Sequence, residues 1–334
     1  MERRDFLRFF GYFGFSTLIA SCLPAPAPTS NPTPTSNPTP SSTSIPTSTP
    51  SPTSASYPSK GPLPARSTFG PTLEQTSLGS EYEPNITFSC GWENGITGNG
   101  KWKELQVVDP SRFVQDNLRA RTGSYSAKVT LRPEDEVNGS ERSEVAIMKD
   151  GGGAAIDENQ DSGIQYIAFS SFMDSTWQNL KECVLLQLHG PDVYLTSPSF
   201  AFRVSDHFYV TINGGDLDRN PVSTRYDLSR SSFALDAWVD FVIKIKFNAT
   251  ESGSIDVWRR DAGQSEFTNV LSVANVPTLQ YRSTLGNSPS NTGDHYWKHG
   301  LYRSHNATVI STIWHDCITR GSDFNSVVMK AFGG

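Results

Sequence analysis

The chain has few cysteines and no long apolar run, and both absences limit what it can be. It contains 4 cysteines among 334 residues, too few and too widely spaced for a dense disulfide framework or a cysteine-based zinc site. Its longest apolar run, near the N-terminus, covers about a dozen residues, whereas a transmembrane helix needs roughly 20. A permanent membrane span is therefore the less favoured interpretation of that segment.

Basic residues are also scarce relative to acidic ones. The chain has 28 Lys and Arg against 34 Asp and Glu, a net charge of -6. Proteins that bind nucleic acids are usually basic. We therefore expect no nucleic-acid partner, although a local positive cleft is compatible with this balance.

The first 22 residues have the layout of an export signal. Arg3, Arg4 and Arg8 precede the apolar run, and "IASC" at 19–22 follows it. The paired arginines resemble a twin-arginine signal, and "IASC" resembles the lipobox of bacterial lipoproteins, in which the cysteine carries the lipid. We expect an exported bacterial protein, lipid-anchored through Cys22 at the cell envelope or extracellular.

Residues 23–66 are nearly all Pro, Ser and Thr, and "TSNPTP" occurs twice in succession. Such a segment buries too little apolar surface to fold, and its prolines favour an extended chain. We expect a spacer between the anchor and a single domain at 80–334, which no second low-complexity break divides. Within that domain, one pair among Cys90, Cys183 and Cys317 can bridge in an oxidising compartment, and the sequence leaves the pairing open.

Short alternating runs separated by Gly, Asn, Asp or Pro recur along this domain. "SAKVTLRP" places Ala127, Val129 and Leu131 on one face, and "FVIKIKFNA" separates apolar from lysine positions in the same way. Alternation of this kind is typical of half-buried antiparallel strands. We expect an all-β fold, a β-jelly-roll sandwich whose concave sheet holds an extended ligand, with one short helix or turn in 109–120.

Three of the expected strands combine an apolar face with an outer face of long hydrogen-bonding side chains. In "SERSEVAIM" we expect Arg142 and Glu144 outside and Ser143, Val145 and Ile147 inside. In "CVLLQLHG", Gln187 and His189 share a face opposite Leu186 and Leu188. In "HYWKHGLYR", the outer face carries Tyr296, Lys298, Gly300 and Tyr302. Since Gly300 has no side chain, we expect a gap there in which a sugar ring lies close to the strand.

Taken singly, each of these positions has an ordinary structural interpretation. Arg142 and Glu144 could form an exposed ion pair worth at most ~1 kcal/mol, and a lone histidine or tyrosine on a strand is commonly solvated or packed. Together the three strands supply one Arg, one Gln, one His, one Lys and two Tyr side chains. These are hydrogen-bond donors with hardly an acid among them. Glycoside hydrolysis commonly needs two carboxylates, so the set better suits a substrate that itself carries a carboxylate.

The motifs "SERSEV", "LLQLHG", "YWKHGLYR" and "HDCITRG", in this order over roughly residues 85–330, resemble the jelly-roll polysaccharide lyases related to heparin lyase I and glucuronan lyase. Alginate lyases of the same architecture share the Arg-x-Glu, Gln-x-His and Lys-x-Gly-x-Tyr blocks. The resemblance implies β-elimination from a uronic-acid polymer. Two residues after this tyrosine, alginate lyases commonly have a glutamine, whereas this chain has Ser304. The identity of the uronic-acid polymer is therefore left open.

The resemblance also implies roles for individual residues. It implies that Tyr302 acts as acid and base, that His189 and Gln187 flank the scissile sugar, and that Arg142 contacts the carboxylate. It assigns Lys298 to substrate binding, and we add Tyr296 and Glu144 from the same strand faces. A neighbouring cation such as Lys298 would favour the ionised form of Tyr302.

The chemistry fits these residue types independently. Removing the proton on C5 of a uronate builds negative charge on its carboxylate, which Arg142, Gln187 and His189 can stabilise. Tyr302 can take that proton and protonate the leaving O4 if both atoms lie on one side of the ring. For the opposite stereochemistry His189 is the better base, and the sequence leaves this choice open.

We therefore expect a polysaccharide lyase that acts on an acidic polysaccharide as a monomer. It needs no cofactor and has no catalytic metal site, although a structural calcium ion is compatible with the fold. A non-catalytic carbohydrate-binding module of the same fold is the second interpretation. A glycoside hydrolase is the third, and it is disfavoured because no Glu-x-Asp-x-x-Glu pattern occurs.

Overall fold

The computed structural model describes residues 83–333, except 98–99, 179–181, 230–231 and 304–306. The chain divides into two units, Met1–Phe69 and Gly70–Gly334. The first unit lies outside the described residues, and with it the predicted export signal at 1–22, its lipidation site Cys22 and the predicted linker at 23–66. These segments and the domain boundaries stay predictions.

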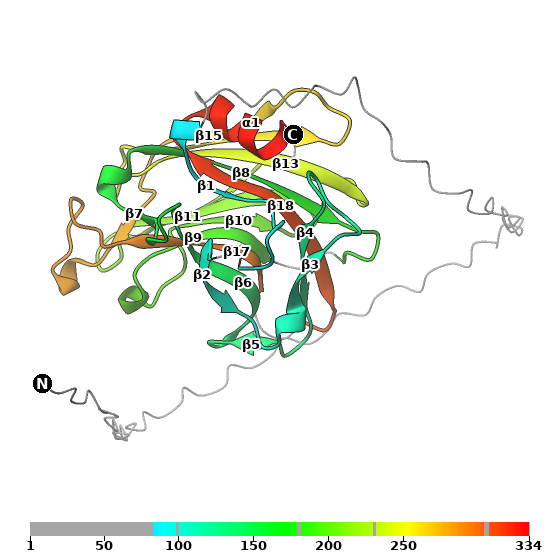
Figure 1. The fold of residues 1–334 in the computed structure, drawn as a ribbon. Coiled ribbons are helices and arrows are strands. Elements are labelled where there is room, and N and C mark those ends of the chain that lie inside the picture. The colour runs from blue at the N-terminus through cyan, green and yellow to red at the C-terminus, as the bar shows by residue number, and fades with distance from the viewer. Residues whose placement is uncertain (1–82, 98–99, 179–181, 230–231, 304–306, 334) are drawn as a thin grey trace, which may run out of the picture. The chain divides into compact units, whose positions relative to one another are not determined.

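Two β-sheets stack as the layers of a sandwich (Figure 1). The first is eight-stranded, with the order β15-β14-β13-β8-β18-β4-β3 and with β1 paired to β18. Its strands are β1 (Ile86–Cys90), β3 (Phe113–Asp116), β4 (Ser126–Leu131), β8 (Ile164–Met173), β13 (Ala237–Lys246), β14 (Gly253–Asp261), β15 (Thr268–Val276) and β18 (Ser311–Gly321).

The second sheet is ten-stranded, with the order β12-β11-β10-β9-β17-β6-β2 and with three two-residue strands, β5, β7 and β16, beside this path. Its strands are β2 (Trp102–Gln106), β5 (Glu136–Val137), β6 (Ser140–Met148), β7 (Asp157–Glu158), β9 (Cys183–His189), β10 (Phe200–Val204), β11 (Phe208–Asp216), β12 (Val222–Asp227), β16 (Gln280–Tyr281) and β17 (His295–Arg303). The predicted all-β sandwich is confirmed, whereas its jelly-roll connectivity and a concave substrate sheet stay predictions.

The core lies between the two sheets and follows the predicted alternation. Ala127, Val129 and Leu131 of β4 are fully buried in it. Leu186 and Leu188 of β9 and Trp297 and Leu301 of β17 meet them from the ten-stranded sheet. Because side chains in a strand alternate between faces, the polar residues between these positions lie on the outer face of that sheet.

One α-helix, α1 (Phe324–Phe332), lies on the outer face of the eight-stranded sheet (Figure 1). Asp323 caps it by accepting from the backbone N–H of Ser326, and its Val327 packs on Ala168 of β8 and Val242 of β13. The sequence analysis missed this helix because its nine residues are too few for a convincing apolar stripe. Short 3-10 helices cover Glu83–Asn85, Pro110–Arg112, Gln160–Ser162, Asp192–Tyr194 and Ser283–Leu285.

The element at Pro110–Arg112 is the short helix expected within 109–120. In the part of the chain that the structure describes, no helix has both the length and the apolar character needed to cross a membrane.

The three cysteines of the described residues, Cys90, Cys183 and Cys317, are buried free thiols. None of the pairings that the sequence left open among these three is formed. Burial raises the pKa of the Cys90 thiol to about 11 and that of Cys183 to about 12, so both are protonated and unreactive near neutral pH.

Candidate active site

Strands β6, β17 and β9 lie side by side in the middle of the ten-stranded sheet and bring the predicted site residues together. Tyr302 of β17 is directly opposite Arg142 of β6. Lys298 is opposite Gln187 of β9, and Tyr296 is opposite His189. Directly opposed residues in neighbouring strands point to the same face, so segments more than a hundred residues apart in sequence form one surface.

Arg142 and Lys298 converge on one acceptor, the side-chain carbonyl of Gln106 at the end of β2. Arg142 Nη1 donates to Gln106 Oε1 at 3.4 Å, and Lys298 Nζ donates to the same oxygen at 3.2 Å. The amide nitrogen of Gln106 donates to Glu104 Oε2 at 3.0 Å. Gln106, which the sequence analysis did not single out, thus holds two cations close together.

Glu144 lies beneath this surface rather than on it, with 0% of its area exposed. It accepts a 2.5 Å hydrogen bond from Gln187 Nε2, and its Oε2 is 4.0 Å from Arg142 Nη1. Burial raises the pKa of Glu144, although Lys298 and Arg142 act in the opposite direction. The expected contact of Glu144 with substrate is therefore replaced by a supporting contact to Gln187, whose side chain is also buried.

His189 is arranged as a neutral base. Its Nδ1 donates to the backbone carbonyl of Gly190 at 2.7 Å, if the ring carries its proton there, which leaves Nε2 as the acceptor nitrogen. Burial, and then the charge of Lys298, lower the pKa of His189. The imidazole is therefore uncharged at neutral pH and able to accept a proton.

Tyr296 stands beside His189, with ring centres 5.3 Å apart. Its hydroxyl donates to Asp192 Oδ1 at 2.6 Å, and burial together with Asp192 raises its pKa. The ammonium of Lys298 lies 5.4 Å from the centre of its ring. These contacts oppose loss of the Tyr296 proton and suit it to positioning Asp192 and the substrate.

Tyr302 has a different environment. Its hydroxyl is 3.3 Å from Ser140 Oγ, and the guanidinium carbon of Arg142 is 5.1 Å from its ring centre. Lys298, expected to be the cation beside Tyr302, instead points to Gln106 and the ring of Tyr296. Arg142 is the cation that contacts Tyr302.

Gly300 is needed for close packing of the strand, not as a gap under the substrate. A Cβ built on it would lie 2.3 Å from the carbonyl oxygen of Ser143 and 2.8 Å from Glu144 Cα. The register between β17 and β9 shifts between His299 and Tyr302, whereas that between β17 and β6 is continuous. Gly300 therefore forms a bulge that keeps β6 close, and the expected sugar-binding gap is wrong.

A groove of about 360 Å³ runs over this surface. Two carboxylates, of Glu104 and Asp192, line it, so the expectation of hardly any acid is wrong. Ile147, expected in the core, lines it as well, because a φ of 62° turns the backbone out of the regular alternation at that residue. The lining residues are Glu104, Gln106, Asn138, Arg142, Ile147, His189, Asp192, Leu195, Thr196, Tyr296 and Lys298.

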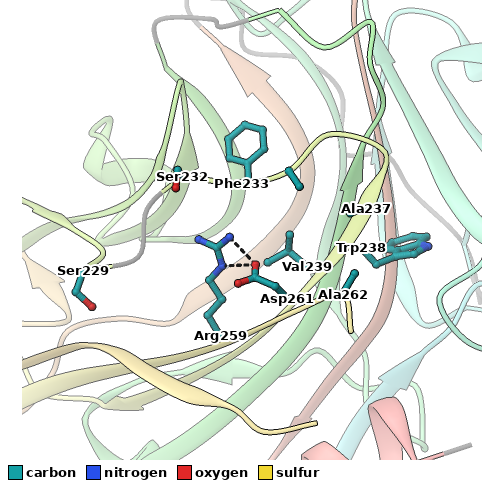
Figure 2. Close-up of a pocket in the computed structure, with 10 residues that line it drawn as sticks. Ser229, Ser232, Phe233, Ala237, Trp238, Val239, Arg259, Asp261 and Ala262 are labelled. Carbon is teal, nitrogen blue, oxygen red and sulfur yellow. Dashed lines mark hydrogen bonds and ion pairs between the residues drawn. The ribbon is translucent and has the colours of Figure 1, made fainter. Parts of the chain in front are cut away.

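A larger hollow of about 520 Å³ lies where β13 begins and β14 ends (Figure 2). Figure 2 shows the guanidinium of Arg259 directed into it and joined to Asp261, with an N–O distance of 2.5 Å. Its lining contains no histidine or tyrosine. Its carboxylate, Asp261, is paired with Arg259, whereas the smaller groove contains His189 beside two cations, so we place the candidate active site in the smaller groove.

Within residues 83–333, outside the gaps given above, no three His, Cys, Asp or Glu side chains gather in a way that could hold a metal ion. The residues of the groove are instead arranged around two cations.

The sequence model of the polysaccharide lyase family matches residues 95–319, more than half of the chain. Among curated protein sequences none matches. The endo-β-1,4-glucuronan lyase of the fungus Trichoderma reesei has a similar structure, with a TM-score of 0.50 and 18% identity over 73% of this chain and 96% of that chain.

An alginate lyase from Aplysia kurodai has a TM-score of 0.48 and 7% identity over 72% of this chain and 98% of its own. The catalytic domain of a glycoside hydrolase family 131 protein from Coprinopsis cinerea has a TM-score of 0.45 and 13% identity over the same shares of the two chains. The likeness to the glucuronan lyase shows the fold alone. The family match itself covers β6, β9 and β17, the three strands that carry the groove, and the chain therefore belongs to the polysaccharide lyase family.

Proposed function

We propose that this polysaccharide lyase cleaves a uronic-acid-containing polysaccharide by β-elimination across C5 and O4. The observation that carries the proposal is the pair of cations, Arg142 and Lys298, held within hydrogen-bond reach of one Gln106 oxygen. His189, with its acceptor nitrogen, lines the same groove. A carboxylate bound by the cations would lie beside a base.

The cations fit the charge that develops in the reaction. As the C5 proton leaves, electron density moves into the substrate carboxylate, and fixed positive charge stabilises that state most in a site with little water. Burial raises the pKa of Glu144, so the ionised form of this carboxyl, which lies beneath Arg142 and Lys298, is disfavoured relative to an exposed glutamate. The substrate carboxylate would then supply the missing counter-charge.

The elimination needs a base for C5 and an acid for O4. The base takes the proton, the C5–H electron pair forms the C4=C5 double bond, and the C4–O4 bond breaks as O4 receives a proton. Tyr302 performs both transfers where the proton and O4 lie on one side of the ring. His189 is the base where they lie on opposite sides, with Tyr302 then protonating O4.

Incubation with a panel of uronate polymers, followed by ultraviolet absorbance of the new double bond, tests the proposal. We expect absorbance with at least one polymer and none with neutral glucans. Release of reducing ends without absorbance would identify hydrolysis, in which the groove carboxylates Glu104 and Asp192 would act. Binding without any product would identify the carbohydrate-binding module considered above.

We also propose that the protein is exported and lipid-anchored through Cys22, on the sequence motif at 19–22 alone. Cys22→Ala should release it from the membrane fraction of an expressing bacterium, while wild-type protein stays with the membranes. Wild-type protein that is already soluble after export would contradict lipidation. Deleting residues 25–60 should leave the melting temperature and the activity on soluble polymer unchanged, because a segment rich in Pro, Ser and Thr has too little apolar surface to fold.

A further inference from the structure

We propose that Arg203 on β10 binds the carboxylate of a second uronate residue, at a distance from the bond that is cleaved. The proposal rests on the proposed function and adds a second acidic sugar to the substrate that the enzyme prefers. Its structural basis is the row of opposed residues that connects Tyr302 with Arg203 across β17, β9 and β10.

A row of directly opposed residues leads from Tyr302 to Arg203 on one face. Tyr302 of β17 is opposite Val184 of β9, Val184 is opposite Arg203 of β10, and Arg203 is opposite Tyr209 of β11. Arg203 is thus two strands from Tyr302, or about 10 Å at the usual spacing of neighbouring strands. A polysaccharide lying across the strands would extend by about two sugar residues over that distance.

Arg203 has an unused charge. Its side chain is half-buried, and its Nε donates to Thr211 Oγ1 at 2.9 Å. In the described part of the chain no carboxylate forms an ion pair with it. Arg225 on the next strand but one differs in this respect, because it pairs with Asp227 at 2.8 Å. With its Nε held by Thr211, the guanidinium of Arg203 is oriented to receive a carboxylate in a bidentate manner.

The residues on either side of Arg203 are covered and leave its guanidinium as the reachable group of this row. Val184, between Tyr302 and Arg203, is 0% exposed. The hydroxyl of Tyr209 is buried and, as far as the described residues go, has no hydrogen-bond partner. Neither Glu182, exposed just before β9, nor Asp206, which lies 2.5 Å from His207 Nδ1, forms an ion pair with Arg203. The half-buried guanidinium of Arg203 is therefore available to the carboxylate of an acidic sugar.

The site predicts that affinity depends on chain length. A long polymer would contact Arg203 and the groove at once, whereas the shortest cleavable oligosaccharide would contact the groove alone. Arg203 should therefore affect KM for the polymer and leave the chemistry at Tyr302 and His189 unchanged.

The test compares Arg203→Gln with wild type on polyglucuronate and on the shortest oligoglucuronate that wild type cleaves. We expect KM for the polymer to rise about tenfold with kcat within about twofold, as for loss of one charged hydrogen-bonding contact. We expect no change with the oligosaccharide. Lys246→Gln removes an exposed cation from the eight-stranded sheet. It should change KM neither for the polymer nor for the oligosaccharide. Arg203→Lys keeps the positive charge but cannot form two parallel hydrogen bonds to a carboxylate. Its KM for the polymer should lie between those of wild type and Arg203→Gln.

Equal effects of Arg203→Gln on polymer and oligosaccharide, or no effect on the polymer, would overturn the proposal. If Arg203→Gln does not fold, as its melting curve would show, Arg203→Lys decides by the same comparison. If the wild-type protein forms no unsaturated product from any uronate polymer, the proposed function fails first. Electrophoresis in gels containing polyglucuronate then decides separately, because equal retardation of wild type and Arg203→Gln would overturn the second site as well.

Discussion

Arg142 lies directly opposite Tyr302 across the β6–β17 pair, with its guanidinium carbon 5.1 Å from the centre of the tyrosine ring. The same guanidinium reaches Gln106, which also holds Lys298. In the proposed mechanism, a uronate whose carboxylate binds Arg142 would lie beside the ring of Tyr302. Arg142 would then couple substrate binding to proton transfer.

We predict that Tyr302→Phe lowers turnover by at least ~10²-fold, the scale of a lost general acid or base. Substrate binding should change little, since the ring is retained. Tyr296→Phe is the matched control and should be much milder, because the hydroxyl of Tyr296 is engaged by Asp192. Initial rates of double-bond formation measure both, and near-normal turnover of Tyr302→Phe would shift the mechanism to His189.

The pH dependence should report His189. Burial and the charge of Lys298 lower its pKa, so the imidazole stays neutral below the ordinary value of about 6.5. Where His189 is the base, kcat/KM falls only as pH drops through this lowered pKa. Lys298→Ala removes the positive charge that lowers the pKa of His189, so an NMR titration should show this pKa moved upward. Lys246→Ala, the control, should leave it unchanged. An unchanged titration in Lys298→Ala would contradict the electrostatic coupling.

Arg142→Ala and Lys298→Ala should each lower kcat/KM by ~10²-fold or more, because each removes a donor that acts on the developing charge. Lys101→Ala, a half-exposed lysine outside the groove, serves as control. Kinetics on the best uronate polymer, at two salt concentrations, provide the measurement. Similar losses in all three variants would show diffuse charge attraction instead of a defined site.

Gly300→Ala should lower the free energy of unfolding by about 3 kcal/mol or more, since the added Cβ overlaps the Ser143 carbonyl. Gly263→Ala is the matched control. Gly263 also has a positive φ, of 83°, but nothing lies within 4 Å of its added Cβ, so its cost should be about 1 kcal/mol. Urea unfolding followed by tryptophan fluorescence compares the two. Equal losses would show that the close approach of β6 has no energetic importance.

The sequence could predict which residues share a face, because alternation in strands is strict wherever one face is buried. Val145, Leu186 and Leu188 fill the core for that reason, and Glu144 and Gln187, which alternate with them, point to the other side. It could not predict that β6, β9 and β17 are neighbours, because that order depends on pairing between distant segments.

The features of the groove that the sequence did not predict have local physical causes. Gln106 comes from a five-residue strand whose sequence shows no special pattern, and Asp192 begins the short 3-10 helix that follows β9. Ile147 departs from alternation through a positive φ, which a β-branched residue rarely adopts. The bulge at Gly300 depends on how β17 pairs with β9. It therefore cannot be predicted from the sequence of β17 alone.

Helix α1 covers the outer face of the eight-stranded sheet (Figure 1). The groove opens on the outer face of the ten-stranded sheet. A tag or solid support joined to the end of α1 would therefore be attached on the side of the sandwich away from the groove. An enzyme immobilised in this way would present its groove to a dissolved polymer too large to enter a porous matrix. Attachment through the hairpin between β5 and β6, where Asn138 lines the groove, would instead obstruct it.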